Sequence, residues 1–538
     1  MTADLSARGR KTNLARMRSE SFDLLVVGGG IVGAGIARDA AMRGLTTALL
    51  EREDFASGTS GKTSRLVHGG LRYLRNLKIG LVRQAVRERD VLLRQAPNLV
   101  RPLAFALPVY RGRGLRRTTI RLGLFVYDSL SRAKILPRRR WLSSEALRFI
   151  EPELTERGLL GGGLYYDAVA NDGRLVLAVV RAAADAGAVI ANHAEVAELL
   201  RPQGRVVGAR VLDRISNESF DVRASVVVNA TGVWLDRLRD RPAGPRTLRP
   251  TKGIHIFLPR ARVGNRAAVA LNTTRDDRTI FVLPWGALTL VGTTDTYYPG
   301  DPDRVVPEAE DVAYLLEGVN EAFPMARVGF GDVVSAYAGL RPLVGGRSST
   351  KESDISREHE IFEDPDGLIS IAGGKLTTHR AMAEDVVDRA CRRLRRALAC
   401  RTEATPLGSA SDAEASFRAL GFDEGTAAHL SARHSPEAIR PFLDSPRGRE
   451  RILHALPHLW AEVDIAVEGE MALTLADVMV RRLGLFYESA DQGLSVAVEV
   501  ADRIAARLGW EPYRVERELR EYGALVADHR RFLEGHGR

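Results

Sequence analysis

The glycine-rich stretch of residues 23–35, DLLVVGGGIVGAG, constrains the fold of this chain more than any other segment. A short apolar run, typical of a buried parallel strand, leads directly into Gly28, Gly30 and Gly33 with the spacing G-x-G-x-x-G. In such a turn the first glycine permits the tight bend, the second lets the backbone approach a pyrophosphate, and the third lets the next helix pack on the strand. We therefore predict a helix over residues 31–43 that begins beside a phosphate.

A second predicted strand completes this unit. Residues 45–50 are apolar and end at Glu51, where an acidic side chain can accept hydrogen bonds from the ribose hydroxyls of a dinucleotide. The glycine triplet alone is weak support for a binding site in a chain with 50 glycines. The complete unit predicts dinucleotide binding, because it combines the first strand, the glycines, the helix, the second strand and Glu51. It does not distinguish NAD from FAD.

The composition indicates a globular chain. With 538 residues, 45% of them hydrophobic and 27% charged, it can form about three domains, or fewer if one is large. No apolar run reaches the roughly 18 residues that span a bilayer, and residues 1–21 lack the apolar core of a signal peptide, so we expect a cytoplasmic protein. The two cysteines, Cys391 and Cys400, are too few for a disulfide framework or a Cys-rich metal site, and we predict no metal ligands.

The net charge of +10 favours an anionic partner, which could be nucleic acid, an acidic lipid surface or a phosphorylated substrate. Residues 111–140 hold ten basic side chains and a single acid, Asp128, interleaved with aliphatic and aromatic residues. This pattern suits a helix that lies in the headgroup plane of an anionic membrane. A solvated basic face over a core helix would have the same pattern, and both interpretations stay open.

The remaining segments fall into an order along the chain. Residues 1–20 are polar and basic, and we predict a flexible tail. Short β segments over residues 246–332 predict an antiparallel sheet that forms a substrate wall, and the chain past residue 402 is predicted to be helical. Residues 54–72 form a loop of short hydroxyl side chains and glycines, which is either a solvated turn cluster or a set of cofactor contacts: Thr59, Ser60, Ser64, His68, Gly69 and Gly70.

Two later strands also end in glycine turns. One runs into Asn229-Ala230-Thr231-Gly232, and the other, over residues 367–372, runs into a turn that opens a helix over residues 379–398. A glycine turn at a helix N-terminus favours an anion or an electron-rich ring edge. The predicted cofactor contacts from these turns are Gly232, Gly373, Gly374, Lys375, Leu376 and Thr377.

In this order the motifs resemble those of the FAD-dependent glycerol-3-phosphate dehydrogenases, membrane-associated enzymes that pass electrons to quinone. The first family signature resembles residues 26–44, VVGGGIVGAGIARDAAMRG, and the second resembles residues 373–383, GGKLTTHRAMA. Between them SRLVHGGLRYL, RLGLFVYD, NATGVW, KGIHI, LPWG, VGTTDT and AGLRPL follow the family order, so the resemblance covers about residues 20–400. One departure is His379, where the family usually has tyrosine, and it leaves the contacts beside the flavin end of that helix in doubt.

The resemblance implies an α/β protein in which a Rossmann-like FAD-binding domain is interleaved with an α+β substrate domain built on an antiparallel sheet, followed by an all-α C-terminal domain. It also selects FAD over NAD, and places residues 111–140 where the family contacts the inner face of the plasma membrane. The resemblance leaves open whether the protein forms a homodimer. The implied divisions are 21–97, 165–245 and 335–401 for FAD binding, 98–164 and 246–334 for the substrate cap, and 402–538 for the helical domain.

The implied reaction belongs to glycerol and glycerophospholipid metabolism. It is oxidation of sn-glycerol 3-phosphate at C2 to dihydroxyacetone phosphate by hydride transfer to FAD, with quinone as the final acceptor. His255 is the first candidate for the base that takes the hydroxyl proton, although a histidine in a β segment is often structural. Lys375 would stabilise the negative charge that develops on the reduced flavin or on the alkoxide, and Arg341 is a further catalytic candidate through contact with the phosphate or the hydroxyl. The predicted substrate contacts are Arg72, Tyr73, Arg341 and Arg357, because guanidinium groups match phosphate oxygens; surface ion pairs are the alternative for the arginines.

Three other functions are considered. An oxidase that uses oxygen in place of quinone is compatible with every motif. An RNA-associated flavoprotein would explain the positive charge, but the basic residues alternate with aliphatic side chains instead of aromatic stacking platforms, so we expect no nucleic-acid partner. A non-catalytic flavin-binding protein is disfavoured because substrate-type arginines accompany the cofactor motifs.

Overall fold

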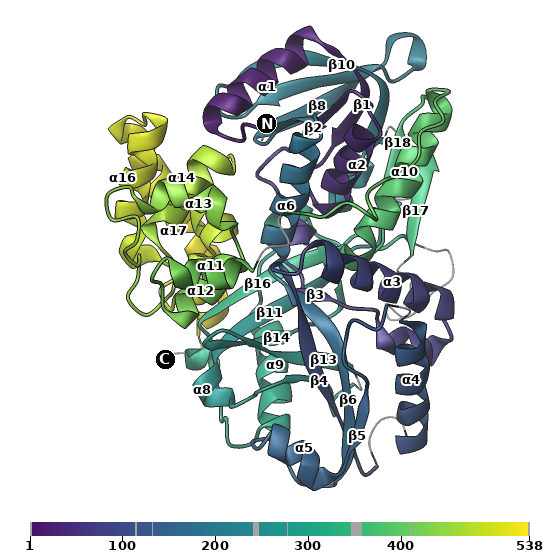
Figure 1. Ribbon diagram of the computed structural model, residues 1–538, viewed down its shortest axis with the longest axis vertical. Coiled ribbons are helices and arrows are strands. Elements are labelled where there is room, and N and C mark those ends of the chain that lie inside the picture. The colour runs from purple at the N-terminus through teal and green to yellow at the C-terminus, as the bar shows by residue number, and fades with distance from the viewer. Residues whose placement is uncertain are drawn as a thin grey trace.

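Two β-sheets lie one above the other along the long axis of the molecule, and a cluster of C-terminal helices stands beside them (Figure 1). The structure is a computed structural model, which describes residues 3–112, 116–131, 133–239, 247–276, 278–345, 358–408 and 412–535. Among the described residues, no helix is both long and apolar enough to cross a membrane.

The upper sheet is built around parallel strands, as a dinucleotide-binding domain requires. Its eight strands are β1 (Ser21–Val27), β2 (Thr47–Leu50), β7 (Val189–Ala191), β8 (Ala194–Leu200), β9 (Gly208–Asp213), β10 (Glu218–Asn229), β17 (His359–Glu363) and β18 (Ile369–Gly373). The strands β18, β10, β1, β2 and β7 are parallel neighbours, and β8, β9 and β17 add antiparallel pairings. The carboxyl ends of the parallel strands therefore meet at one edge, which faces the lower sheet.

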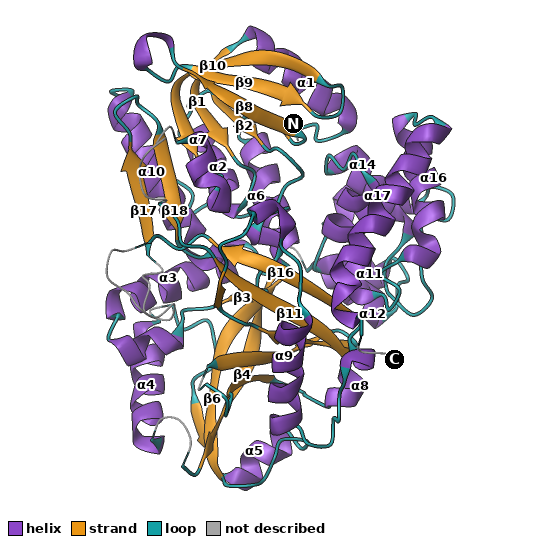
Figure 2. Cartoon of the chain, turned by 180° about the vertical axis from the view of Figure 1, so that it is seen from behind, coloured by secondary structure: helices purple, strands orange, loops and turns teal. Residues whose placement is uncertain are grey.

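Helices cover both faces of the upper sheet because successive residues of a strand point to opposite sides. In β1, Leu24 and Val26 belong to the core shared with α2 (Ile31–Met42), α6 (Asp172–Asp185) and α10 (His379–Arg393). Leu25 and Val27 belong to the core on the other face, which β8, β9 and α1 (Ala7–Ser19) complete. Figure 2 shows α2 and α10 on one side of this sheet and α1 at its top.

The predicted flexible tail is wrong for most of residues 1–20, because α1 packs on the upper sheet. Ser6 caps this helix by accepting a hydrogen bond from the backbone N–H of Gly9, and Leu14 and Met17 are buried. Arg10 is also buried; its Nε donates to the backbone carbonyl of residue 192, and its guanidinium forms a 2.6 Å ion pair with Asp213. A segment that reads as polar is ordered here by a partner about 200 residues away.

The lower sheet is almost wholly antiparallel, as predicted for the substrate domain; only β12 and β4 pair in parallel among its described strands. Its ten strands are β3 (Leu66–Val67), β4 (Val100–Tyr110), β5 (Arg140–Leu142), β6 (Leu159–Ala170), β11 (Thr251–Pro259), β12 (Ala268–Asn272), β13 (Thr279–Trp285), β14 (Leu288–Gly292), β15 (Thr296–Tyr297) and β16 (Ser335–Arg341). Because β3, the end of β6 and β16 pair here, residues 66–67, 165–170 and 335–341 belong to the substrate sheet, and not to the FAD pieces to which the sequence divisions assign them.

Five helices accompany the lower sheet. The apolar face of α9 packs on one side of the sheet through Val312, Leu315, Leu316 and Val319. On the other side α3 and α4 contribute Val82, Val86, Leu124 and Tyr127 to a second core. The helices are α3 (Ile79–Gln95), α4 (Arg117–Leu130), α5 (Ser144–Ile150), α8 (Arg260–Val263) and α9 (Ala309–Ala322), and α7 (Leu235–Leu238) follows β10.

The C-terminal domain is all-α, as predicted. Its helices are α11 (Ala413–Ala419), α12 (Glu424–Ser431), α13 (Pro436–Leu443), α14 (Trp460–Gly469), α15 (Leu485–Glu488), α16 (Ala497–Leu508) and α17 (Pro512–Arg530). Tyr487 of α15 packs edge-on against Tyr337 of the lower sheet, with ring centroids 5.3 Å apart. Buried charges join the domain to the upper sheet: Asp54 pairs with Arg481 at 2.7 Å and with Arg482 at 2.6 Å.

Candidate active site

The glycine turn after β1 has the close contacts that its sequence predicts. Gly28 has a φ of +111°, and a Cβ on it would lie 2.6 Å from a backbone oxygen of the turn after β10. A Cβ on Gly33 would lie 1.8 Å from the carbonyl oxygen of Gly28, so only glycine lets α2 approach so closely. A Cβ on Gly30 would lie 3.0 Å from Ser60 Oγ, which accepts a hydrogen bond from Ile31 N. The turn thus exposes bare backbone at a helix N-terminus, which fits a pyrophosphate.

Glu51 lies beside this turn, directly after β2. Its Oε2 accepts a 2.6 Å hydrogen bond from the backbone N–H of Gly29, and its Oε1 accepts one of 2.9 Å from that of Glu53. Burial raises the pKa of the Glu51 carboxyl, and the two backbone hydrogen bonds act in the opposite direction. The carboxylate is therefore held against the predicted nucleotide site, and its contact with a ribose stays a prediction.

The other two glycine turns meet the first at the same edge, because β10 and β18 run parallel to β1. Gly232 has a φ of +59°, and a Cβ on it would meet nothing within 4 Å. Gly373 and Gly374 have φ values of +76° and +78°, and a Cβ on Gly374 would lie 2.3 Å from the sulfur of Met382. Each of these positions favours glycine, and together the three turns form one glycine-lined edge.

A cavity of about 1380 Å³ is lined by residues of the lower sheet, by the loop of residues 54–72 and by the turn after β18. This volume exceeds the 300–1,000 Å³ or so of an ordinary small-molecule pocket, so it can take a bulky ring system together with a small substrate. The cavity brings together most of the predicted site residues that do not belong to the nucleotide turn: Thr59, Ser64, His68, Gly70, Arg72, Tyr73, His255, Arg341, Gly374, Lys375, Leu376 and Thr377.

Hydrogen bonds hold the loop of residues 54–72 against its surroundings. Thr59 Oγ1 donates to the carbonyl oxygen of Leu340 in β16 at 2.6 Å. The backbone N–H of His68 donates to Thr377 Oγ1 at 3.2 Å, which joins this loop to the turn after β18. The backbone N–H of Gly69 donates to the hydroxyl of Tyr127 at 2.9 Å. The loop is therefore a packed wall of the cavity, not a solvated turn cluster.

His255 lies in the middle of β11 and faces residues of both domains. Its Nε2 lies 2.8 Å from Ser64 Oγ, and its ring stacks on Tyr337 with centroids 4.9 Å apart. Burial lowers the pKa of His255 well below its ordinary value, and the positive charges of Arg341 and Arg65 add to the effect. The imidazole is therefore neutral at pH 7, as a proton acceptor must be.

Three of the predicted cationic side chains line the same cavity. Lys375 Nζ lies 3.9 Å from the ring centroid of Tyr73, and the guanidinium carbon of Arg72 lies 5.6 Å from that ring. Glycine is needed at position 70, because a Cβ there would lie 2.5 Å from the Tyr73 ring and 3.1 Å from Lys375 Nζ. Tyr73 thus organises two of the predicted cations.

Arg341 lies at the end of β16. It is the third predicted cation that lines the cavity. One of its terminal nitrogens lies 3.0 Å from Asp295 Oδ1 and the other donates to Thr293 Oγ1 at 3.0 Å. The ion pair considered for this arginine does exist, but it lies in the cavity wall instead of on the outer surface. Arg357 lies outside the described residues.

Several cavity residues were not predicted. Lys62 lines the cavity, and burial lowers the pKa of its ammonium to about 8, with the positive charge of Arg481 adding to the effect. Its position in the loop of residues 54–72, among candidate cofactor residues, was an available signal. Asp295, which holds Arg341, is the aspartate of the family-like VGTTDT stretch, so that motif was an available signal. Tyr337 lies outside the cavity lining and gave no such signal, because only the folded sheet brings it to His255.

His379 begins α10 next to the turn after β18. Its Nδ1 lies 2.9 Å from the carbonyl oxygen of Leu376, and burial lowers the pKa of its imidazole to about 4. A Cβ on Gly35 would lie 3.2 Å from the His379 ring, so the ring packs between α10 and α2. A neutral histidine therefore serves here as a packing residue at the helix start.

Comparison with known families and proteins matches nearly the whole chain. Residues 23–389 match the family described as FAD-dependent oxidoreductase, and residues 400–515 match the family described as the C-terminal domain of alpha-glycerophosphate oxidase. The chain is similar to glycerol-3-phosphate dehydrogenase of Mycobacterium leprae, with 38% identity over 97% of this chain and 91% of that protein. It is 33% identical to aerobic glycerol-3-phosphate dehydrogenase of Staphylococcus saprophyticus, over 96% of each chain.

A solved structure is similar over the same length. The glycerol-3-phosphate dehydrogenase of Bacillus halodurans, a crystal structure of the complex with FAD, superposes with a TM-score of 0.82 and 31% identity. The match covers 98% of this chain and 99% of that one. The similarity therefore includes both sheets and the helical domain.

Proposed function

Since this chain belongs to the family of FAD-dependent oxidoreductases that includes the glycerol-3-phosphate dehydrogenases, we propose that it oxidises sn-glycerol 3-phosphate to dihydroxyacetone phosphate and passes the electrons to a membrane quinone. The observation that carries the proposal is the neutral His255 in one cavity with Arg72, Arg341 and Lys375. A base and a set of cations are what an alcohol that bears a phosphate requires. FAD, when bound along the three glycine turns, supplies the hydride acceptor.

In this proposal His255 takes the proton of the C2 hydroxyl at Nε2, the nitrogen that contacts Ser64. Ser64 holds the ring in place, and Tyr337 supports its face. The positive charge of Arg341 lowers the basicity of the imidazole in the free protein. A phosphate dianion beside Arg341 offsets that charge, so substrate binding itself strengthens the base.

The cations have two tasks. Arg341 and Arg72 offer guanidinium donors to phosphate oxygens, and Asp295 and Thr293 orient Arg341 for this contact. Lys375 lies at the turn after β18, where its charge stabilises the negative charge that develops as the hydroxyl proton leaves. Arg357 is retained as a third phosphate contact on the basis of the family resemblance alone.

The first test is anaerobic bleaching of the flavin absorbance by glycerol 3-phosphate. We expect the phosphate ester to bleach the flavin, and we expect glycerol and a 2-hydroxy acid to leave it unchanged because neither carries the dianion that the arginines bind. A bound flavin that none of the three compounds reduces would contradict the assignment of the cavity cations.

A variant of Arg341 distinguishes weaker binding of glycerol 3-phosphate from loss of the flavin. Arg341→Gln should retain flavin but require a concentration of glycerol 3-phosphate higher by roughly tenfold or more for half-maximal bleaching, because a charged hydrogen bond to phosphate contributes about 1.5–3 kcal/mol. An unchanged concentration would assign the phosphate to other cations of the cavity.

The proposal that a membrane quinone accepts the electrons rests on the exposed face of α4 and the adjoining turn. Leu77, Ile79 and Leu122 are exposed apolar residues that also line the cavity, and Phe125 is 54% exposed beside them in the chain. Leu124 and Tyr127 anchor the other face of α4 in the core. Arg139 lies over the ring of Phe125, 4.9 Å from its centroid, and the basic residues of this stretch suit anionic headgroups. We infer that a quinone enters here from the bilayer and that the protein binds at the inner face of the plasma membrane.

Vesicle sedimentation tests this surface. We expect the protein to bind phosphatidylglycerol vesicles more strongly than phosphatidylcholine vesicles, and added salt to weaken the binding. Leu122→Asp and Phe125→Asp should each weaken binding about tenfold, since burying one such side chain contributes about 1.5–3 kcal/mol. Met325→Asp is the control, because Met325 is an exposed apolar residue (68%) outside this rim. Equal loss of binding in the control would refute the assigned face.

An oxidase is the second candidate function. It is favoured by the match of residues 400–515 to the C-terminal domain family of alpha-glycerophosphate oxidase. Turnover with glycerol 3-phosphate in air would release one peroxide per substrate if oxygen is the acceptor, and little peroxide if a quinone analogue is the faster acceptor.

A further inference from the structure

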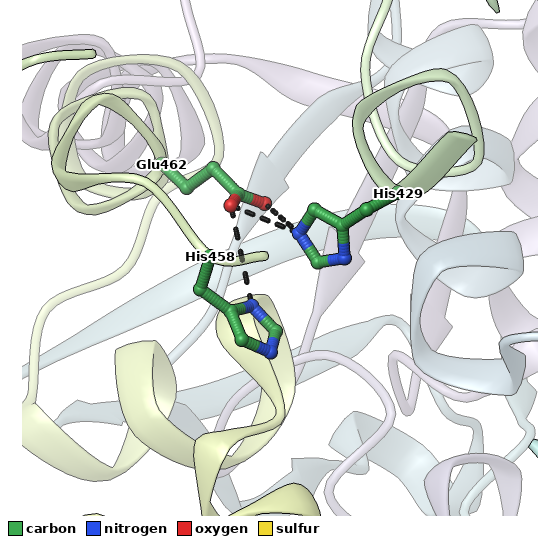
Figure 3. Close-up of side chains that lie close together, drawn as sticks. All are labelled: His429, His458 and Glu462. Atoms are coloured by element: carbon green, nitrogen blue, oxygen red, sulfur yellow. Dashed lines mark hydrogen bonds and ion pairs between the residues drawn. The ribbon is translucent and has the colours of Figure 1, made fainter. Parts of the chain in front are cut away.

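A cluster of metal-ligating side chains lies in the helical domain, away from the cavity. His429 comes from the last turn of α12, His458 precedes α14, and Glu462 lies in the first turn of α14 (Figure 3). The side chains of His458 and Glu462 are 0% and 1% exposed, and that of His429 is 8% exposed. One donor atom from each residue lies within 4.8 Å of the other two.

The donor atoms are spaced as a small cation would require. His429 Nε2 lies 3.0 Å from Glu462 Oε2, and His458 Nδ1 lies 4.0 Å from that same oxygen. Bonds of about 2.0–2.1 Å in a tetrahedral site place neighbouring ligand atoms about 3.3 Å apart. The 3.0 Å pair is already near this spacing, and His458 Nδ1 would move about 0.7 Å toward Glu462 Oε2 to reach it.

One atom of the cluster lacks the partner that its burial demands. His458 Nδ1 makes no hydrogen bond to any described residue although the side chain is fully buried. His458 Nε2 lies 3.0 Å from Glu488 Oε2, and since a carboxylate only accepts, the proton of the ring is on Nε2. Nδ1 therefore directs a lone pair toward the electron-rich oxygen of Glu462. Glu462 Oε2 already accepts a 2.9 Å hydrogen bond from the backbone N–H of Leu459, so a cation between the two atoms would chiefly supply the partner that Nδ1 lacks.

The contact between His458 and Glu488 also resembles the hydrogen bond that a metal-binding histidine makes with its second ring nitrogen. Histidine ligands commonly donate their second ring N–H to a carboxylate, which fixes the tautomer and the ring orientation. Glu488 is itself held in place, because Trp285 Nε1 of the lower sheet donates to its Oε1 at 3.2 Å. The chain from Trp285 to His458 thus presents Nδ1 in a fixed direction.

The charge around Glu462 supports the same conclusion. The ion-pair partners that Glu462 has among the described residues are the imidazoles of His429, His434 and His458. A second cluster consists of Asp54, His193 and Asp477. It differs from the first because Arg481 and Arg482 contact its carboxylates and balance their negative charge. That second cluster needs no metal ion, whereas Glu462 has no guanidinium or ammonium contact in the described part of the chain.

We propose that His429, His458 and Glu462 bind one divalent transition-metal ion of the zinc class, which fastens α12 to the start of α14. Two imidazole nitrogens and one carboxylate suit zinc and its neighbours better than magnesium or calcium, which prefer oxygen ligands alone. A water molecule completes the coordination. The ion would stabilise the helical domain and takes no part in the oxidation.

The test uses the untagged, flavin-loaded full chain. After incubation with excess Zn²⁺ and desalting, elemental analysis should find about one zinc per chain, and zinc should raise Tm by roughly 5 °C over the EDTA-treated protein, since a ligand that binds only the folded state stabilises it. Cobalt in place of zinc should give the visible absorption bands of a four-coordinate site. Glu462→Gln, which keeps the size of the side chain, should abolish the metal content, the Tm shift and the cobalt bands.

The control is His193→Gln, which changes the second cluster and should keep the metal. If the Glu462→Gln protein does not fold, the metal content and cobalt spectrum of the wild-type protein still decide the question. A wild-type protein that retains less than about a tenth of an equivalent of zinc after desalting would overturn the proposal.

Discussion

The His255→Ala variant should have a kcat lower by roughly a hundredfold or more while its flavin content is unchanged, since loss of general base catalysis costs about 10²–10⁴-fold. His255 is buried in the cavity wall, its Nε2 contacts Ser64, and no nucleotide turn depends on it. The measurement is steady-state oxidation of glycerol 3-phosphate with a quinone analogue, normalised to bound flavin. His454→Ala, which changes an exposed histidine of the helical domain, is the control and should leave kcat as it is.

The pH profile gives the same prediction a second readout. Only the neutral imidazole accepts a proton, so activity should be lost as the pH falls through the pKa of His255. Burial first, and then the charges of Arg341 and Arg65, hold that pKa well below 6.5, so the acid limb of kcat/KM should lie below pH 6.5. The limb of kcat should lie at higher pH, because bound phosphate offsets the charge of Arg341. An acid limb that persists unchanged in His255→Ala would assign the proton to another group, and an unchanged kcat would remove His255 from the mechanism.

The Gly33→Ala variant should lose most of its bound flavin and unfold at a lower temperature. A Cβ at this position would lie 1.8 Å from the carbonyl oxygen of Gly28, so either α2 or the turn must move. Overpacking of this kind costs about 1–3 kcal/mol, and the displaced atoms are those that approach the pyrophosphate. Flavin absorbance per chain and thermal unfolding, both measured on freshly purified protein, check the two effects.

Gly80→Ala is the matched control for that substitution. Gly80 lies in α3, and a Cβ on it would meet nothing within 4 Å. Alanine there should leave flavin content unchanged and raise stability by up to about 1 kcal/mol, because it favours the helix. If Gly33→Ala retained full flavin and matched Gly80→Ala in Tm, the close packing of α2 on the turn would have no role in cofactor binding.

The parts of the fold that the sequence predicts well are those whose physical causes are local. Gly33 meets Gly28 within the same turn, so the spacing of the motif carries that information, whereas Gly28 and Gly30 meet Ala230 and Ser60 from later segments. Parallel pairing of β1, β10 and β18 then places the later glycine turns beside the first without further assumptions. The cavity cations and His255 were identified through family-like motifs, and the structure brings all of those described into one cavity.

The errors share a different cause, which is long-range pairing of polar residues. The composition of residues 1–20 predicts a tail because Arg10 and its neighbours are polar, yet Asp213 and the upper sheet bury Arg10. The proposed metal cluster was missed for a related reason. His458 and Glu462 are four residues apart, which is a common spacing for ligands on one face of a helix, but His429 belongs to another helix. Only the packing of α12 on α14 brings the three together.

The buried pairs between Asp54 and the arginines at positions 481 and 482 have a consequence for the boundary near residue 400. The two family matches meet there, which marks a division in sequence. A chain cut at that point would lose both arginines that pair with Asp54, whose side chain is 0% exposed in the intact chain. The packing of Tyr487 on Tyr337 would be lost as well. We therefore expect separation of the two regions to lower the stability of each, so that they act as one folding unit across the boundary between the family matches.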